Sequence, residues 1–98
     1  MIILVFRDRA TEDIFHGWAT KAARKLLPLP LWKVAGRKLE QLDSAARLED
    51  LKAPPGSRLE ALSGTREGQH SIRINDQYRI CFRWTASGPT KVEITDYH

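Results

Sequence analysis

The sequence has 98 residues, of which 42% are hydrophobic and 29% charged, which suits one small domain over residues 1–98 and excludes a chain of several domains. No apolar run approaches the roughly 20 residues that a membrane-spanning helix needs, and the apolar-then-basic start is the reverse of a signal peptide. The net charge of +4 is too small to indicate a nucleic-acid partner by itself. We therefore expect a cytoplasmic protein without membrane contact.

The first half of the chain is predicted to be a short strand followed by helices. The continuous apolar run over residues 2–6 is typical of a buried strand. Apolar residues at helical spacing predict one helix over residues 11–18 and a second over residues 19–27, which ends before two prolines. The clearest amphipathic helix runs from about residue 31 to residue 46. We expect Trp18 to lie in the core and leave Trp32 open.

The second half of the chain is predicted to be rich in strands. A loop over residues 52–57 is followed by a short strand over residues 58–62. Three longer strands follow, over residues 70–75, 78–85 and 90–96. This order predicts an α+β domain in which N-terminal helices pack on one face of an antiparallel sheet.

The segment SIRINDQYRICFRW predicts how two of these strands face each other. A two-residue turn would mix apolar and charged residues on the same face. A three-residue turn over residues 75–77 instead pairs Ile74 with Tyr78 and Arg73 with Arg79, which keeps the apolar side chains together. We therefore expect Arg73 and Arg79 side by side on the opposite face.

Arg83 is predicted to lie on the same face, further along the strand. Like charges directly opposite each other destabilise a hairpin by up to about 1 kcal/mol. One interpretation is an ordinary solvated strand face. The other is a preformed anion site, because planar guanidinium groups suit phosphate better than ammonium groups do. The second interpretation is slightly favoured.

The last three residues, Asp96, Tyr97 and His98, follow the final predicted strand. A carboxylate, a phenol and an imidazole can together serve acid–base chemistry, although a frayed surface tail is the commoner use of such residues. The single cysteine, Cys81, has no metal-ligand spacing around it and is expected to be a structural thiol. Since no phosphate-binding loop or paired histidine motif occurs, we expect neither a metal nor another cofactor.

Several motifs follow one another in an order that resembles the HigB toxins, a branch of the RelE-like toxin superfamily. The motifs are G-x-R-x-G, S-I-R-I-N-x-Q-Y-R-I-x-F and the terminal D-Y-H, and the resemblance is dense over residues 52–98. It implies a small RelE-like domain that acts as a ribosome-dependent mRNA endoribonuclease without a metal. Attack by the 2′-hydroxyl would give a 2′,3′-cyclic phosphate and a free 5′-hydroxyl.

The resemblance also implies the partners of the chain. These are the ribosome and mRNA, together with a cognate helix-turn-helix antitoxin (HigA-like) that holds the toxin inactive. Operator DNA would be contacted only indirectly, through the antitoxin. Docking among rRNA phosphates would use Lys33, Arg37 and Lys38, which lie in a stretch over residues 14–39 that contains no acid. Arg83, on a predicted strand, would also contact RNA. The alternative for the helical cations is an ordinary solvated face.

Roles at the active site are carried over residue by residue from the resemblance. The phosphate would be bound by Arg66, Arg73 and Arg79. His98 would be the general acid, Asp96 the general base or the residue that orients His98, and Tyr97 would position the nucleotide or stabilise the phosphorane. Glu60 departs from the pattern, since some relatives have histidine there. A carboxylate at this position could accept the 2′-hydroxyl proton, or could simply face solvent.

Two other functions also fit parts of the sequence. A ParE-like gyrase inhibitor shares the fold, but it has no use for the terminal Asp-Tyr-His trio. A module that binds ribosomes or RNA without cleaving would fit a site in which Glu60 cannot replace a histidine.

Overall fold

The computed structural model describes residues 2–52 and 55–96. The helices come first and the strands follow: α1 (Arg9–His16), α2 (Lys21–Leu26), α3 (Trp32–Ser44), β1 (Glu60–Ala61), β2 (His70–Arg73), β3 (Tyr78–Thr85) and β4 (Gly88–Asp96). Short 3₁₀ helices connect them: η1 (Leu29–Leu31), η2 (Leu48–Lys52), η3 (Pro55–Ser57) and η4 (Gly64–Arg66). Among the described residues, no helix is long and apolar enough to cross a membrane.

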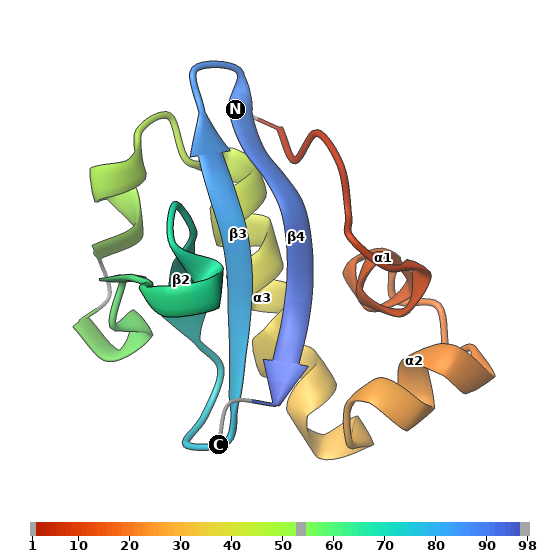
Figure 1. Ribbon diagram of the computed structural model, residues 1–98. Helices are drawn as coiled ribbons and strands as arrows, with labels where there is room; N and C mark the ends of the chain where they lie inside the picture. Colours follow the sequence, from red (N-terminus) through yellow and green to blue (C-terminus); the bar gives the residue numbers. More distant parts are fainter. Residues whose placement is uncertain (1, 53–54, 97–98) are drawn as a thin grey trace.

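The strands form one antiparallel sheet in the order β1-β2-β3-β4. Helix α3 lies across one face of this sheet, behind β3 and β4 in Figure 1, while α1 and α2 lie beside β4. The apolar side chains of α3 pack on apolar side chains of the sheet. The fully buried residues at this contact are Ala35, Leu39 and Leu42 of α3 and Ile72, Ile80, Phe82 and Val92 of the strands. The predicted α+β class with helices on one face is confirmed.

Buried polar side chains attach the first two helices to the sheet and to each other. Thr11 in α1 accepts a hydrogen bond from the backbone N–H of Ile94 in β4 through its Oγ1, at 3.0 Å. Asp13 Oδ2 accepts from Thr20 Oγ1 at 2.7 Å, and the same Thr20 oxygen accepts from the N–H of Ala23 to cap α2. The position of β4 is therefore tied directly to α1.

The predicted buried strand over residues 2–6 is wrong. The segment makes one parallel bridge, Phe6 to Val92, instead of a full ladder. The reason lies in β4, where Lys91 has a φ of 52° and the register with β3 shifts as at a β-bulge. This bend limits pairing with the N-terminal segment, and Ile2 and Val5 are left 67% and 53% exposed.

The three predicted helices and the last predicted strand begin or end one or two residues from their expected bounds. Two strands differ for a reason that the local structure explains. The strand expected over residues 58–62 is only the two-residue β1, because Arg58 has a left-handed φ of 45° that breaks the extended backbone. Strand β2 ends at Arg73 instead of residue 75, because the Asn75 side chain folds the chain into the following turn.

The expectation that Trp18 lies in the core is also wrong. Gly17 ends α1 with a left-handed φ of 77°, and Trp18 follows it with 55% of its surface exposed. The indole stacks on the ring of His16, at 4.4 Å between centroids. Trp32 is half-buried, and its Nε1 donates to the carbonyl oxygen of Leu27 at 2.8 Å.

Candidate active site on the outer face of the sheet

The hairpin between β2 and β3 has the predicted register. Arg73 and Arg79 are direct partners, and the N–H of Ile74 donates to the carbonyl oxygen of Tyr78 at 2.9 Å. The Asn75 Oδ1 accepts hydrogen bonds from the backbone N–H groups two and three residues later, at 2.9 and 2.7 Å. This side-chain turn selects the three-residue connection. The two arginines therefore lie side by side on the face away from α3, here called the outer face.

Acids of the same chain offset the repulsion between these two arginines. The guanidinium of Arg73 is paired with Asp76, three residues later. Arg79 Nη2 lies 3.8 Å from Oε1 of Glu60, which shares the outer face through its pairing with Ser71. The side chain of Glu60 is 55% exposed, so its carboxylate is accessible next to the arginine pair.

Arg79 is held in a fixed orientation across the sheet. Its side chain is only 11% exposed. Its Nε donates to Ser71 Oγ and its Nη2 to the carbonyl oxygen of Arg58, each at 2.7 Å. A cation that is held this way is oriented before any ligand arrives, which is the condition for electrostatic preorganisation.

A second cluster on the outer face joins Arg66 to the end of the N-terminal segment. Arg66 Nη1 lies 3.3 Å from Glu93 Oε2 and 3.2 Å from Gln69 Oε1. Arg7 Nε lies 3.4 Å from the same Glu93 oxygen. With Thr65 these four residues line a polar hollow of about 240 Å³.

Sequence reasoning missed Arg7 and Glu93 as members of the site. The alternation of β4 places Glu93 on the outer face, opposite Cys81, and this signal was present in the sequence. Arg7 carried no comparable signal. It reaches the site because its backbone N–H bonds to the carbonyl oxygen of Val92, a contact between distant parts of the chain.

Arg83 completes the outer face beside η4. Its Nη2 lies 3.4 Å from the carbonyl oxygen of Glu67. A Cβ atom on Gly68 would stand 2.5 Å from Arg83 Nη1, and Gly68 has a φ of 90°. The second glycine of the G-x-R-x-G motif is thus favoured by its backbone conformation, and its missing side chain leaves room for the Arg83 guanidinium, the end of a flexible side chain.

Asp96 lies at the end of β4, on the opposite face of the sheet from the arginines. It is opposite Tyr78, which packs on the core, whereas Thr95 is opposite Arg79. Its Oδ2 accepts a hydrogen bond from Gln77 Nε2 at 3.1 Å. Asp96 therefore begins on the helix side of the strand, unlike the arginines. Tyr97 and His98 lie outside the described residues.

Comparison with known proteins places the chain in a family. Residues 5–98 match the family described as the RelE-like toxin of type II toxin-antitoxin system HigB. The chain belongs to this HigB-like toxin family. It is 40% identical over 81 residues to Toxin HigB-1 of Vibrio cholerae, which covers 83% of this chain and 82% of the relative. It is 36% identical over 79 residues to an uncharacterized protein of Haemophilus influenzae, covering 81% and 75% respectively. The predicted relationship is confirmed.

In this HigB-like toxin, the predicted RNA-docking cations of α3 lie on the helical side of the sheet. Lys33 and Arg37 are exposed. Lys38 is half-buried and donates a short hydrogen bond to Ser57 Oγ. Burial, and secondarily the neighbouring Arg37 cation, lowers the pKa of Lys38 from its ordinary value. The three cations thus differ in environment, and their contact with rRNA stays a prediction.

The toxin's cysteine is buried on the outer side of β3. Cys81 is fully buried between its partners Ser71 and Glu93. Desolvation raises the pKa of its thiol above the ordinary value, and neighbouring Thr95 and Arg66 act in the opposite direction. Among residues 2–52 and 55–96, no group of three or more His, Cys, Asp or Glu side chains could hold a metal ion.

Proposed function

We propose that this HigB-like toxin is a ribosome-dependent mRNA endoribonuclease that acts in the cytoplasm and is neutralised by a cognate helix-turn-helix antitoxin. Family membership supports the proposal. The observation that carries it is the outer face, where Arg73 and Arg79 lie side by side and an exposed Glu60 carboxylate stands 3.8 Å from Arg79. Paired cations beside a proton acceptor suit cleavage of a phosphodiester.

The chemistry consists of an attack within the substrate. The 2′-hydroxyl loses its proton, and its oxygen forms a bond to the adjacent phosphorus. The bond from phosphorus to the 5′ oxygen breaks, and this oxygen takes up a proton. The products are a 2′,3′-cyclic phosphate and a free 5′-hydroxyl, so that atoms and charge balance without a metal or an added reactant.

The arginines stabilise the extra negative charge of the phosphorane. Arg79 is oriented by Ser71 and the Arg58 carbonyl, and Arg66 by Glu93 and Gln69. Because these guanidinium groups are already held, little reorganisation is needed when charge develops, and such stabilisation contributes several kcal/mol. Arg73 is the third phosphate ligand, and a bound phosphate competes with Asp76 for it.

Two carboxylates are candidates for the general base. Glu60 shares the outer face with the arginines, whereas the register of β4 starts Asp96 on the opposite side. This difference favours Glu60 as the base and Asp96 as the residue that orients His98. His98 then protonates the leaving oxygen, and Tyr97 positions the nucleotide, as the family pattern implies.

Primer extension on mRNA from an in vitro translation reaction tests the proposal. We expect the wild-type chain to cut within translated codons, and both Glu60→Gln and a variant that ends at Asp96 to cut at least about a hundredfold more slowly. Glu49→Gln, which removes an exposed carboxylate on η2, serves as the matched control and should cut at the wild-type rate.

Each alternative has its own result in this assay. If Glu60→Gln cuts as fast as wild type, the base is not Glu60. If the variant ending at Asp96 keeps full activity, Tyr97 and His98 have no catalytic role. If the wild-type chain makes no cuts, the proposal fails, and inhibition of gyrase supercoiling or binding without cleavage becomes the function to test.

A further inference from the structure

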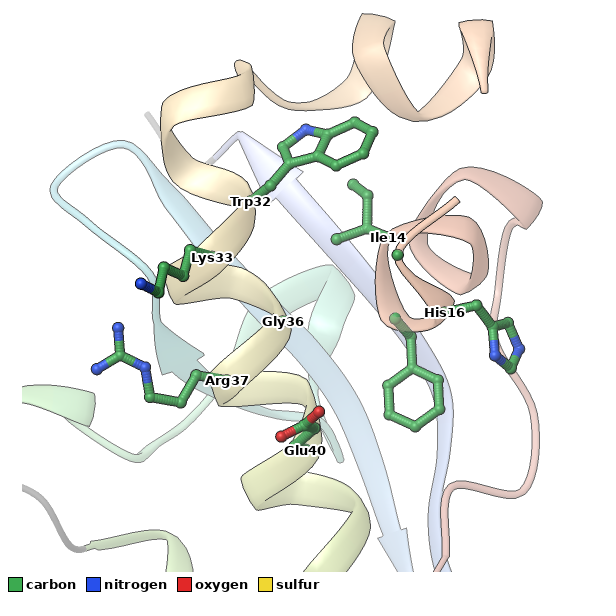
Figure 2. Close-up of a pocket in the computed structure, with 9 residues that line it drawn as sticks. Ile14, His16, Trp32, Lys33, Gly36, Arg37 and Glu40 are labelled. Carbon is green, nitrogen blue, oxygen red and sulfur yellow. The ribbon is translucent and has the colours of Figure 1, made fainter. Parts of the chain in front are cut away.

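A groove runs between α1 and α3, on the helical side of the molecule. It has a volume of about 540 Å³. Its apolar lining comes from Ile14, Phe15 and Trp32, and its polar lining from His16, Gly17, Lys33, Gly36, Arg37 and Glu40. Figure 2 shows Gly36 between the α1 side chains on one bank and the cations Lys33 and Arg37 on the other. We refer to it as the α1–α3 groove.

Gly36 is a costly residue at the centre of this groove. Glycine in a helix interior destabilises the helix relative to alanine. The internal packing of the chain does not explain the choice, because a Cβ atom on Gly36 would meet no atom within 4 Å. The missing side chain instead leaves the floor of the groove open, which allows close approach by a second polypeptide.

The charges around the groove specify what that second polypeptide carries. Lys33 and Arg37 are one helical turn apart and both exposed. Residues 14–39 contain no acid, and Glu40 contributes the one carboxylate among the groove-lining residues. A ligand that matches this groove therefore has apolar side chains on one face and carboxylates along its edge. This is the pattern of an acidic amphipathic helix.

RNA matches the groove less well than a helix does. A phosphate backbone would gain the two cations but would bury the half-exposed apolar surfaces of Phe15 and Trp32 without any apolar contact in return. An amphipathic helix satisfies both parts of the groove, and side chains at helical spacing can enter above Gly36.

We propose that the α1–α3 groove is the docking site for an acidic amphipathic helix of the cognate antitoxin. The antitoxin is the partner that membership of the family implies, and in naming it this inference rests on the proposed function. The groove lies on the helical side of the sheet, whereas the arginines lie on the outer face. Docking and cleavage can therefore be tested separately.

The test uses the purified antitoxin, the protein encoded by the gene beside the toxin gene. It is titrated into the full toxin chain, and calorimetry gives the dissociation constant. Gly36→Ala and Gly36→Leu should weaken binding by about 5- and 100-fold, because each places atoms where the docked helix packs. Gly36→Ala should at the same time raise the melting temperature of the free toxin. If Gly36 had only a structural role, a substitution that raises the melting temperature would not also weaken binding of the antitoxin.

A double charge reversal tests the role of Lys33 and Arg37, the cations that line the groove. Lys33→Glu with Arg37→Glu should weaken binding by more than about 30-fold, since two attractive contacts become repulsive. The matched control is Lys21→Glu with Lys25→Glu, which makes the same change at the same spacing on α2, outside the groove. This control should change binding less than about threefold.

Several results would overturn the inference. One is a wild-type chain that does not bind the neighbouring gene product. Another is unchanged affinity in both Gly36→Leu and the groove charge reversal. A third is a groove charge reversal that weakens cosedimentation with ribosomes and leaves antitoxin binding intact, which would make the groove an RNA surface. Cleavage by Gly36→Leu should match wild type, so failure of the endoribonuclease proposal and failure of this one are distinguishable.

Discussion

Glu93 shares one carboxylate oxygen between Arg66 and Arg7, at 3.3 and 3.4 Å. We expect Glu93→Gln to lower kcat for mRNA cleavage by about tenfold to a hundredfold, because Arg66 loses the charged one of the two partners that orient it. KM should stay the same or fall, since the site gains one net positive charge. Steady-state cleavage on programmed ribosomes separates the two constants.

The control for this change is Glu49→Gln, which breaks a surface ion pair with Arg47. It should leave both constants unchanged, as exposed pairs contribute little. A wild-type kcat in Glu93→Gln would mean that Arg66 does not need Glu93 to reach the phosphate. An equal rise in KM would instead point to a role for Glu93 in binding.

Cys81 gives a pH-dependent prediction at the same scale. Burial raises the pKa of its thiol, so the folded chain keeps this proton at a pH where the unfolded chain releases it. The contribution to stability is fully present below about pH 8.5 and is lost as pH rises above that value. Urea unfolding at pH 7.5 and 9.5 should show a loss of about 1 kcal/mol that Cys81→Ala lacks. An identical pH dependence in both proteins would contradict this.

At the scale of elements, the bond from Ile94 to Thr11 fastens β4 to α1. Thr11→Val keeps the shape of the buried side chain but removes the acceptor for the Ile94 N–H. We expect it to lower the free energy of unfolding by about 1–3 kcal/mol, the cost of an unsatisfied buried donor. Urea denaturation provides the measurement, and Thr11→Ser is the control because it retains the oxygen. Equal stability of the valine variant would show that water or another group satisfies Ile94.

Elements governed by local chemistry could be predicted from the sequence. The hairpin was predictable because alternating apolar residues fix the faces and Asn75 forms the turn with its own side chain. The strand expected over residues 2–6 was not, since its pairing depends on a bulge near Lys91, in a distant part of the chain. The exposure of Trp18 was also not predicted. In this case the cause is local: the left-handed Gly17 ends α1 directly before it.

The same distinction applies to the candidate site. Arg73, Arg79 and Arg83 could be predicted because one strand pairing places them on one face. Arg7 joins Arg66 and Glu93 only after the N-terminal segment bonds to β4, so no local pattern announces it. The ion pairs of Arg73 and Arg79 were also not foreseen, since Asp76 and Glu60 become their partners through the turn and through β1.

At the scale of the whole molecule, the sheet separates two cationic surfaces. The outer face carries Arg66, Arg73 and Arg79 beside their acidic partners, and Arg83 near the carbonyl oxygen of Glu67. Lys33 and Arg37 instead border the α1–α3 groove. The cations of the chain thus lie on two sides with different surroundings. A substrate made of phosphates and a partner made of protein can then be bound by separate surfaces.

This separation predicts how ribosome binding responds to salt. Each phosphate contact adds about 0.7–0.9 to the slope of log K against log salt. If the outer face meets RNA, Arg83→Ala should reduce that slope by about one, whereas Lys25→Ala on α2 should leave it unchanged. Cosedimentation with ribosomes measures both slopes. The salt concentration is varied from about 50 to about 200 mM, the range over which phosphate contacts weaken. Equal slopes for the two variants would mean that the ribosome does not distinguish the two sides of the sheet, and the assignment of the outer face to RNA would fail.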